Sequence, residues 1–225
     1  MTTPTPEPEA DHQGRVHAAP SQDRGGHTID WDERYSMADK MWSGQPNGAL
    51  VTEVTPLVPG TALDVGCGEG ADAVWLAGLG WKVTAIDVTQ VALGRASSAA
   101  ELANVQVDWL LTGLLDVTLP DDGFDLVSVQ YPALPHTPTK DAERTLLAAV
   151  ALNGHLVVVH HADVDDQVAK AHGFDPDDYV SSTDVSSLLD DDWTVIVNER
   201  RPRHLSVGAG AGHTHDLVLH AIRVR

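Results

Sequence analysis

The sequence has little cysteine, few basic residues and no long apolar run. Its 225 residues include one cysteine, Cys67, which excludes an internal disulfide framework. Lysine and arginine number 14 against 33 aspartates and glutamates, a formal charge of −19 that argues against a nucleic-acid partner. No stretch approaches membrane-spanning length, and the N-terminal residues lack a secretory apolar region. We therefore expect a cytoplasmic protein with one α/β domain and neither nucleic-acid nor membrane partners.

Aromatic residues are also scarce, at 5% of the chain. Outside residues 29–57 they offer no stacking platform for a nucleobase substrate. The few basic residues are not evenly spread, because Arg200, Arg201 and Arg203 stand together and could form a local basic patch. The remaining acidity is interpreted as a solubility feature.

The stretch from Ala62 to Asp87 predicts a strand, a glycine-rich turn, a helix and a second strand. It reads ALDVGCGEGADAVWLAGLGWKVTAID, and its helix is indicated by apolar residues at i, i+3, i+4 and i+8 from Ala71. Such a unit is typical of a nucleoside site. The glycines let a ligand approach the backbone, and the helix N-terminus offers free N–H groups. Asp87, at the end of the second strand, can accept hydrogen bonds from ribose hydroxyls.

The glycine spacing separates two kinds of nucleoside site. A dinucleotide fold uses G-x-G-x-x-G, whereas Gly66, Gly68 and Gly70 give G-x-G-x-G. Asp64, just before them, would repel a pyrophosphate but suits a cationic amine. The stretch resembles the nucleotide-binding motif of class I S-adenosylmethionine-dependent methyltransferases, with a dehydrogenase as an alternative.

This resemblance implies S-adenosylmethionine as the cofactor, with Asp64 near its ammonium group and Asp87 on its ribose. Asp87 could instead cap the following helix. Cys67 is interpreted as a small filler of the turn, because no base stands beside it. The implied cofactor-binding residues are Asp64, Gly66, Cys67, Gly68, Gly70, Asp87, Val88, Gly113, Leu114 and Gln130.

The adenine end departs from the family pattern. These methyltransferases commonly carry an acid after the third strand that accepts from the adenine amino group, but the matching position here is about Gly113. The adenine is therefore expected to meet the Leu114 backbone or the Thr112 hydroxyl. Asp116 is a possible displaced acid, or a solvated loop residue.

The N-terminal region divides into two parts. Residues 1–28 contain four prolines and almost no large apolar residue, so they are predicted to be a disordered tail. Residues 29–57 (WDERY…MWSGQPNGALV) resemble the helical cap of tellurite-resistance and thiopurine S-methyltransferases, which closes over cofactor and substrate. That resemblance makes Trp31, Tyr35 and Trp42 substrate-binding candidates. The alternative is that they pack the helix onto the sheet.

The rest of residues 29–225 predicts a doubly wound, Rossmann-like α/β domain. Buried strands are indicated at Val105–Leu110, Phe124–Gln130, His155–His161, Trp193–Glu199 and Asp216–Val224. Helices are indicated at Asp30–Met41, Leu50–Leu57, Val91–Leu102, Lys140–Leu152 and Thr183–Leu189, with Asp30 and Thr183 as caps. The resemblance implies a seven-stranded sheet, ordered 3-2-1-4-5-7-6 with strand seven antiparallel.

Histidines near the strand ends are the candidates for the acceptor side. His160 and His161 point to opposite faces of their strand, so at most one faces the cofactor directly. His160, His136 and Tyr131 are candidate catalytic residues, and His161 a candidate for substrate binding. Each histidine could instead bond only to a loop. No base is needed for an anionic acceptor, and no metal is expected, because the His and Asp near 160–166 and 213–216 fit no zinc spacing.

These patterns favour an S-adenosylmethionine-dependent methyltransferase with a small-molecule acceptor. The acceptor would carry a thiol, a metalloid or a hydroxyl group, and transfer would be in line. The alternative is a non-catalytic protein that senses S-adenosylmethionine or S-adenosylhomocysteine. The sequence predicts no oligomeric state.

Overall fold

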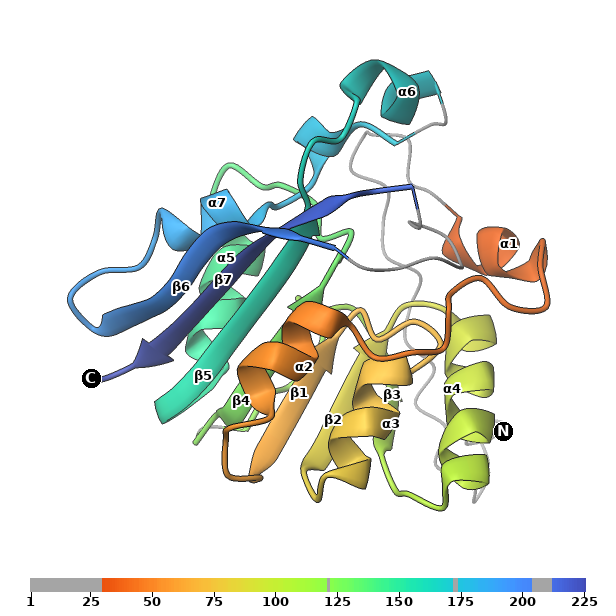
Figure 1. Cartoon of the computed structure of the whole chain (residues 1–225), viewed down its shortest axis with the longest axis horizontal. Coiled ribbons are helices and arrows are strands. Elements are labelled where there is room, and N and C mark those ends of the chain that lie inside the picture. Colours follow the sequence, from red (N-terminus) through yellow and green to blue (C-terminus); the bar gives the residue numbers. More distant parts are fainter. Residues whose placement is uncertain (1–29, 121, 172–173, 204–211) are drawn as a thin grey trace, which may run out of the picture.

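The computed structural model describes residues 30–120, 122–171, 174–203 and 212–225 (Figure 1). The tail predicted over residues 1–28 lies outside them. The strands are β1 Thr61–Val65, β2 Lys82–Asp87, β3 Asp108–Leu111, β4 Phe124–Gln130, β5 Val150–His161, β6 Trp193–Pro202 and β7 His215–Arg223. The helices are α1 Trp31–Ser36, α2 Gly48–Val54, α3 Ala71–Gly78, α4 Gln90–Ala103, α5 Asp141–Ala148, α6 Asp166–Ala171, the 3₁₀ turn η1 Pro176–Asp178 and α7 Ser182–Ser186.

The seven strands form one sheet in the order β3-β2-β1-β4-β5-β7-β6. Strands β1 to β5 pair in parallel, and β7 is antiparallel to both of its neighbours. This confirms the predicted Rossmann-like fold and strand order. Because the carboxyl ends of parallel strands meet at one edge, the glycine turn after β1, Asp87 after β2 and Tyr131 after β4 share that edge.

Helices cover both faces of the sheet (Figure 1). On one face α2 and α3 pack Leu50 and Leu76 into a core with alternate strand residues. On the other face α5 and α7 pack Leu146 and Val185. Strand β5 serves both cores, since Val157 and Val159 join the first and Leu156 and Val158 the second, as the two-residue period of a strand requires.

The boundary between α5 and β5 differs from the prediction. The sequence predicts a helix to Leu152 and a stop at Asn153–Gly154, but α5 ends at Ala148 and β5 begins at Val150. Asn153 adopts φ of 64°, and the pairing with β4 shifts register between Phe124 and Leu126. The Asn-Gly pair is thus an irregularity inside a strand.

Two shorter helices also differ from their predicted limits. The helix capped by Asp30 ends at Ser36 rather than Met41, because the carbonyls of Tyr35 and Ala38 accept hydrogen bonds from Arg95. Helix α7 begins at Ser182, and Ser181 is its cap, because Ser181 and Asp184 form a capping box. Thr183 is therefore not the cap.

Candidate functional site

The turn between β1 and α3 depends on glycine for its conformation and its packing. Gly68 and Gly70 have φ of 52° and 79°, in the left-handed region. A Cβ on Gly70 would lie 2.7 Å from the Cβ of Ala96, and one on Gly68 would lie 2.7 Å from the Tyr35 hydroxyl. The turn is therefore pressed against α4 on one side and the N-terminal segment on the other.

Asp87 ties this turn to the end of β2. Its carboxylate accepts hydrogen bonds from the backbone N–H groups of Gly68 at 2.8 Å and Thr89 at 3.0 Å. Burial raises its pKa, although these hydrogen bonds act in the opposite direction. The cap of α4 is Thr89, whose hydroxyl accepts from the N–H of Ala92 at 3.1 Å. Each Asp87 oxygen keeps a lone pair that a ribose hydroxyl could use.

Asp64, at the end of β1, is buried beside two other acids. Its Oδ2 has no hydrogen-bond partner among the described residues. Burial raises its pKa well above the usual range, and Asp72 and Asp87 add to the effect. Asp72 is itself held by Asn47, whose backbone and side-chain N–H groups each donate at 2.7 Å. Among the described residues no cation forms an ion pair with Asp64, Asp72 or Asp87, and Arg203 acts on Asp72 only through its charge. The turn therefore fits a positively charged ligand and disfavours a pyrophosphate.

The residues expected around adenine lie beside this turn. A Cβ on Gly113 would be 3.7 Å from Val88 Cγ1 and 3.3 Å from an Asp116 carboxylate oxygen. The Val88 side chain is exposed, whereas Leu114 is buried in the core. Val88 and the Gly113 backbone thus form a small apolar surface with Asp116 at its border.

Cys67 and Gln130 complete the predicted cofactor residues. Burial raises the pKa of the Cys67 thiol, so this side chain stays protonated within the turn. Gln130 donates to the Ser128 hydroxyl at 3.3 Å, and its own carbonyl oxygen is buried without a partner among the described residues.

Two of the three cap aromatics lie directly over the glycine turn. Tyr35 is buried, and its hydroxyl accepts a hydrogen bond from Trp42 Nε1 at 2.8 Å. Both side chains contact the space that a Cβ on Gly68 would fill. Trp31 lies behind Tyr35, with ring centroids 6.4 Å apart. The cap is therefore closed on the turn in this structure.

An ion pair holds the cap in this position, and the sequence analysis did not include it. Glu69 accepts from the Trp42 backbone N–H at 3.0 Å and pairs with Arg95 at 2.8 Å. Arg95 also donates to the carbonyls of Tyr35 and Ala38 at 2.9 and 2.6 Å. The available signal was that Arg95 is the lone cation of its alanine-rich helix.

A second group of side chains lies at the ends of β4, β5 and β7. Tyr131 has φ of 51°, and it packs with the α2–α3 core rather than following the alternation of β4. The His161 ring lies between Tyr131 and His213, at centroid distances of 4.2 and 3.9 Å. Arg203 lies 4.6 Å over the Tyr131 ring and pairs with Asp216 at 3.3 Å. We call these five residues the Tyr131 cluster.

Asp216 is the anion of the Tyr131 cluster. Burial alone would raise its pKa, but the nearby polar groups of His161 and Tyr131 and the charge of Arg203 hold it below its usual range. His161 Nδ1 lies 3.6 Å from Asp216 Oδ1. The cluster thus contains one ion pair within a set of stacked rings.

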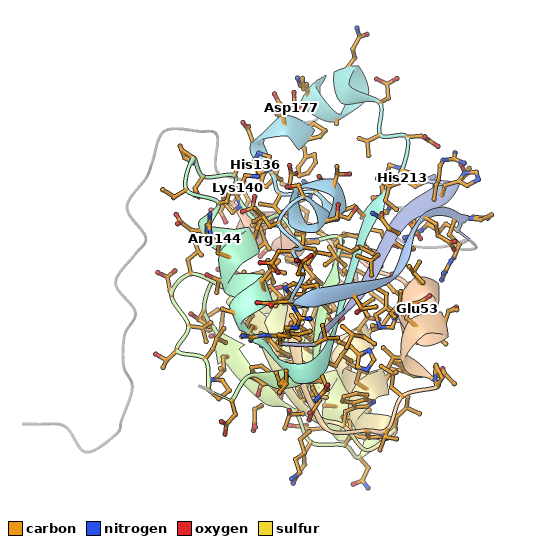
Figure 2. All side chains as sticks on the ribbon, turned by 90° about the vertical axis from the view of Figure 1, so that its left-hand side faces the viewer. Glu53, His136, Lys140, Arg144, Asp177 and His213 are labelled. Carbon is orange, nitrogen blue, oxygen red and sulfur yellow. The ribbon has the colours of Figure 1, made fainter. Side chains whose placement is uncertain are left out.

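The other two candidate catalytic histidines lie away from the Tyr131 cluster. His160 points to the α5–α7 face, and burial together with the neighbouring His161 lowers its pKa to about 4. His136 pairs with Asp184, in α7, at 3.1 Å. Figure 2 shows His136 and His213 on opposite sides of this end of the molecule. The structure therefore brings Tyr131 and His161 together. It places His160 and His136 outside that cluster, both within reach of the charge of Asp184.

The three neighbouring arginines do not form a common basic patch. Each pairs with a different acid: Arg200 with Asp163, Arg201 with Glu53, and Arg203 with Asp216. Among residues 30–225, in the ranges the structure describes, no three His, Cys, Asp or Glu side chains are placed to hold a metal ion. None of the described helices has the length and apolarity needed to cross a bilayer.

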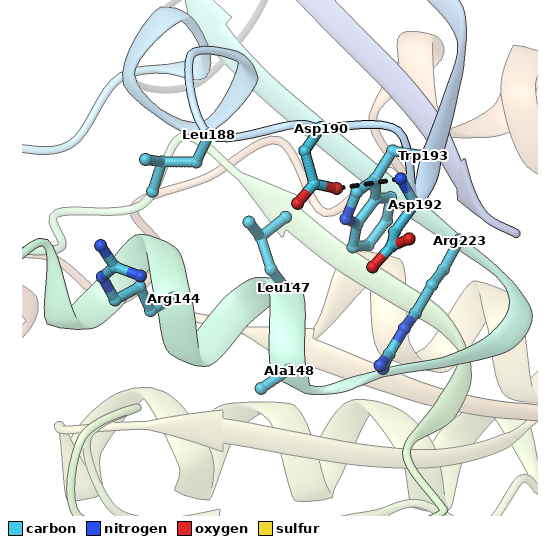
Figure 3. A pocket seen from close by; sticks show the side chains of 8 residues that line it. All are labelled: Arg144, Leu147, Ala148, Leu188, Asp190, Asp192, Trp193 and Arg223. Carbon is cyan, nitrogen blue, oxygen red and sulfur yellow. Dashed lines mark hydrogen bonds between the residues drawn. The ribbon is translucent and has the colours of Figure 1, made fainter. Parts of the chain in front are cut away.

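A hollow of about 290 Å³ lies elsewhere, between α5 and the start of β6 (Figure 3). Its walls include Arg144, Leu147, Asp190, Trp193 and Arg223. None of the predicted site residues lines it, so we do not assign the predicted site to this hollow.

Comparison with known proteins finds matches to the part of the chain that contains the glycine turn. Residues 62–153 match the family model of a methyltransferase domain. An uncharacterized methyltransferase of Mycobacterium tuberculosis is 37% identical over 123 residues, which are 54% of this chain and 61% of that relative. The chain thus spans less than two thirds of the relative's length.

Solved structures share the fold. One structure has a TM-score of 0.67 at 22% identity, and the match covers 86% of this chain and 90% of that chain. It was solved for work on the conversion of a disulfide bond into a thioacetal group during echinomycin biosynthesis. The N-methyltransferase NodS from Bradyrhizobium japonicum, in complex with S-adenosyl-L-homocysteine, has a TM-score of 0.59 at 22% identity, covering 86% and 87%. This likeness does not single out the tellurite-resistance and thiopurine group. Residues 62–153 are thus similar to a methyltransferase domain, and the chain shares the fold of a methyltransferase solved in complex with S-adenosyl-L-homocysteine.

Proposed function

We propose that the protein transfers the methyl group of S-adenosylmethionine to a small-molecule acceptor. The observation that carries this proposal is the buried, unpartnered carboxylate oxygen of Asp64 beside Asp72 and Asp87. A cationic cofactor would favour the ionised form of this acid, which burial and the neighbouring acids disfavour, whereas the pyrophosphate of a dinucleotide would disfavour it further. Bound S-adenosylmethionine supplies an electrophilic methyl group on a positively charged sulfur.

The residues around the turn then have distinct binding roles. Asp64 faces the ammonium group of the cofactor, and Asp87 accepts from its ribose hydroxyls while holding the Gly68 backbone. The apolar surface of Val88 and Gly113 receives the adenine, with Asp116 as an acceptor for its amino group. Tyr35 and Trp42 form the lid over this pocket.

The acceptor lies on the other side of the turn, against Tyr131 and His161. In-line transfer requires mainly that the nucleophile be held in line with the methyl group. A thiol, a metalloid oxyanion or a hydroxyl suits this arrangement, in keeping with the thiopurine and tellurite group. His161, whose Nδ1 is close to Asp216, is better placed than His160 to accept a proton from a thiol or hydroxyl.

Transfer of a labelled methyl group from S-adenosylmethionine tests the proposal. The purified chain is incubated with a panel of thiols, hydroxylated metabolites and tellurite, and labelled products are separated from the protein. We expect label on at least one acceptor. Tight binding of S-adenosylmethionine without transfer to any acceptor would support the sensor instead, and binding of NADH alone would support a dehydrogenase.

A further inference from the structure

Arg203 has a free hydrogen-bonding edge although it is buried. Its side chain is only 9% exposed, and its Nη1 donates to Asp216 at 3.3 Å and to the Tyr131 hydroxyl. Its Nε is fully buried and has no partner among the described residues. The side-chain hydrogen bonds that Arg203 makes to described residues all use Nη1, and none uses Nη2. Within the part of the chain that the structure describes, Nη1 is thus occupied, while the edge formed by Nε and Nη2 is unpaired.

A purely structural arginine would not be expected to keep this edge unpaired. A buried charged donor without an acceptor destabilises the fold, and most such groups bond to a carbonyl or to water. Arg201 differs because an acid lies at each of two groups: Glu199 accepts from its Nε at 3.0 Å, and Glu53 lies 2.8 Å from its Nη1, an ion pair without hydrogen-bond geometry. The free edge of Arg203 therefore indicates a ligand group.

The position of Arg203 relates this ligand to the methyl acceptor. Arg203 lies over Tyr131, and the residue after Tyr131, Pro132, would be 3.8 Å from a Cβ on Gly66. The Tyr131 cluster therefore borders the glycine turn where the cofactor binds. A ligand that reaches Arg203 would lie along the stacked rings of Tyr131 and His161.

We propose that the Nε–Nη2 edge of Arg203 binds a carboxylate of the methyl acceptor. This inference rests on the proposed function, because it assigns a chemical class to the acceptor of that reaction. The two parallel N–H groups match the two oxygens of a carboxylate. A singly charged group fits better than a phosphate, because Asp216 is already in contact with Arg203 and Asp72 lies close enough to feel its charge. The nearby rings provide the wall for the apolar part of an aromatic or thiol acid.

Binding of benzoate and of its neutral analogue benzamide to the full chain tests this proposal. Affinities are measured by calorimetry or NMR in the presence of saturating S-adenosylhomocysteine. We expect benzoate to bind at least ten times more tightly than benzamide. Arg203→Met should reduce benzoate affinity at least tenfold, and Arg203→Lys, which keeps the charge but loses the paired edge, should reduce it severalfold.

Arg200→Met is the matched control, because it removes an arginine that is paired on the surface with Asp163. It should leave benzoate affinity unchanged. Equal binding of benzoate and benzamide, no binding of benzoate to the wild type, or equal benzoate affinity in the wild type and both Arg203 variants would overturn the proposal. S-adenosylhomocysteine affinity is read separately, since its absence in the wild type would contradict the proposed function instead. Should Arg203→Met fail to fold, the Arg203→Lys result decides.

Discussion

Asp64 on β1 and Asp216 on β7 are both buried carboxylates at the edge of the sheet where the parallel strands end, but their surroundings differ in charge. Asp64 is next to two further acids, and its pKa is raised by burial and by those acids. Asp216 pairs with Arg203, and its pKa is held below the usual range. The glycine turn therefore gathers acids that form no ion pair with a described residue, whereas the Tyr131 cluster pairs its acid with an arginine. On the proposed function, this difference suits a cationic cofactor beside the glycine turn and an anionic acceptor beside Arg203.

The largest expected effect comes from breaking the pair on the acceptor side. Asp216→Asn leaves the buried Arg203 guanidinium without its anion, so we expect the free energy of unfolding to fall by about 3–5 kcal/mol. Urea unfolding followed by circular dichroism measures this loss. The exposed acid Asp108, changed to Asn, is the control and should have little effect. A stable Asp216→Asn protein would mean that Arg203 is not held by this ion pair.

Acidification tests the burial of His160. The pKa of His160 is about 4 in the folded protein, against about 6.5 in an unfolded chain. The unfolded state therefore binds more protons between these values, and stability contributed by neutral His160 is present above pH 6.5 and lost as the pH falls towards 4. The loss amounts to about 3 kcal/mol.

The measurement compares unfolding of the wild type with that of His160→Leu at several pH values. The raised pKa of Asp64 acts in the opposite direction in both proteins, so the difference between them isolates His160. Identical pH profiles would show that His160 does not have the burial described.

On the cofactor side, Asp87→Ala should weaken binding of S-adenosylhomocysteine. The change removes one or two hydrogen bonds to a charged group, each contributing about 1.5–3 kcal/mol. Calorimetry measures the affinity, and thermal unfolding checks that the Gly68 turn has kept its fold. Asp108→Ala serves as the matched loss of a carboxylate. Unchanged affinity would place the ribose elsewhere.

The smallest expected effect is a gain in stability that accompanies a loss of cofactor affinity. Asp64→Asn removes a buried acid whose ionised form is disfavoured by burial and by two neighbouring acids, so the unliganded protein should become more stable by about 1 kcal/mol. Affinity for S-adenosylmethionine should fall about tenfold, because one charge-assisted contact is lost. Thermal unfolding and calorimetry of the same variant read both quantities. A less stable variant with full affinity would contradict the charge comparison.

The sequence predicts the cofactor half of the fold well because its signals are local. The limits of β4 are those predicted, and the strand order follows the family pattern. The errors arise where a distant residue decides a local structure. Arg95, far along the chain, donates to the Tyr35 carbonyl at the end of α1. The pairing of β5 with β4 makes Asn153–Gly154 an irregularity within a strand rather than the end of a helix.

The acceptor half could be predicted only in part. Tyr131 and His161 follow from their positions at strand ends, but their stacking depends on the positive φ of Tyr131. Arg203 and Asp216 meet only through the pairing of β6 with β7. No spacing in the sequence shows that one edge of Arg203 stays free.

The most direct test of the central claim is a calorimetric titration of the wild-type chain with S-adenosylmethionine, S-adenosylhomocysteine and NADH. We expect S-adenosylmethionine and S-adenosylhomocysteine to bind, and NADH to give no measurable heat of binding, because its pyrophosphate would meet Asp64, Asp72 and Asp87. Binding of NADH without binding of S-adenosylmethionine would contradict the account.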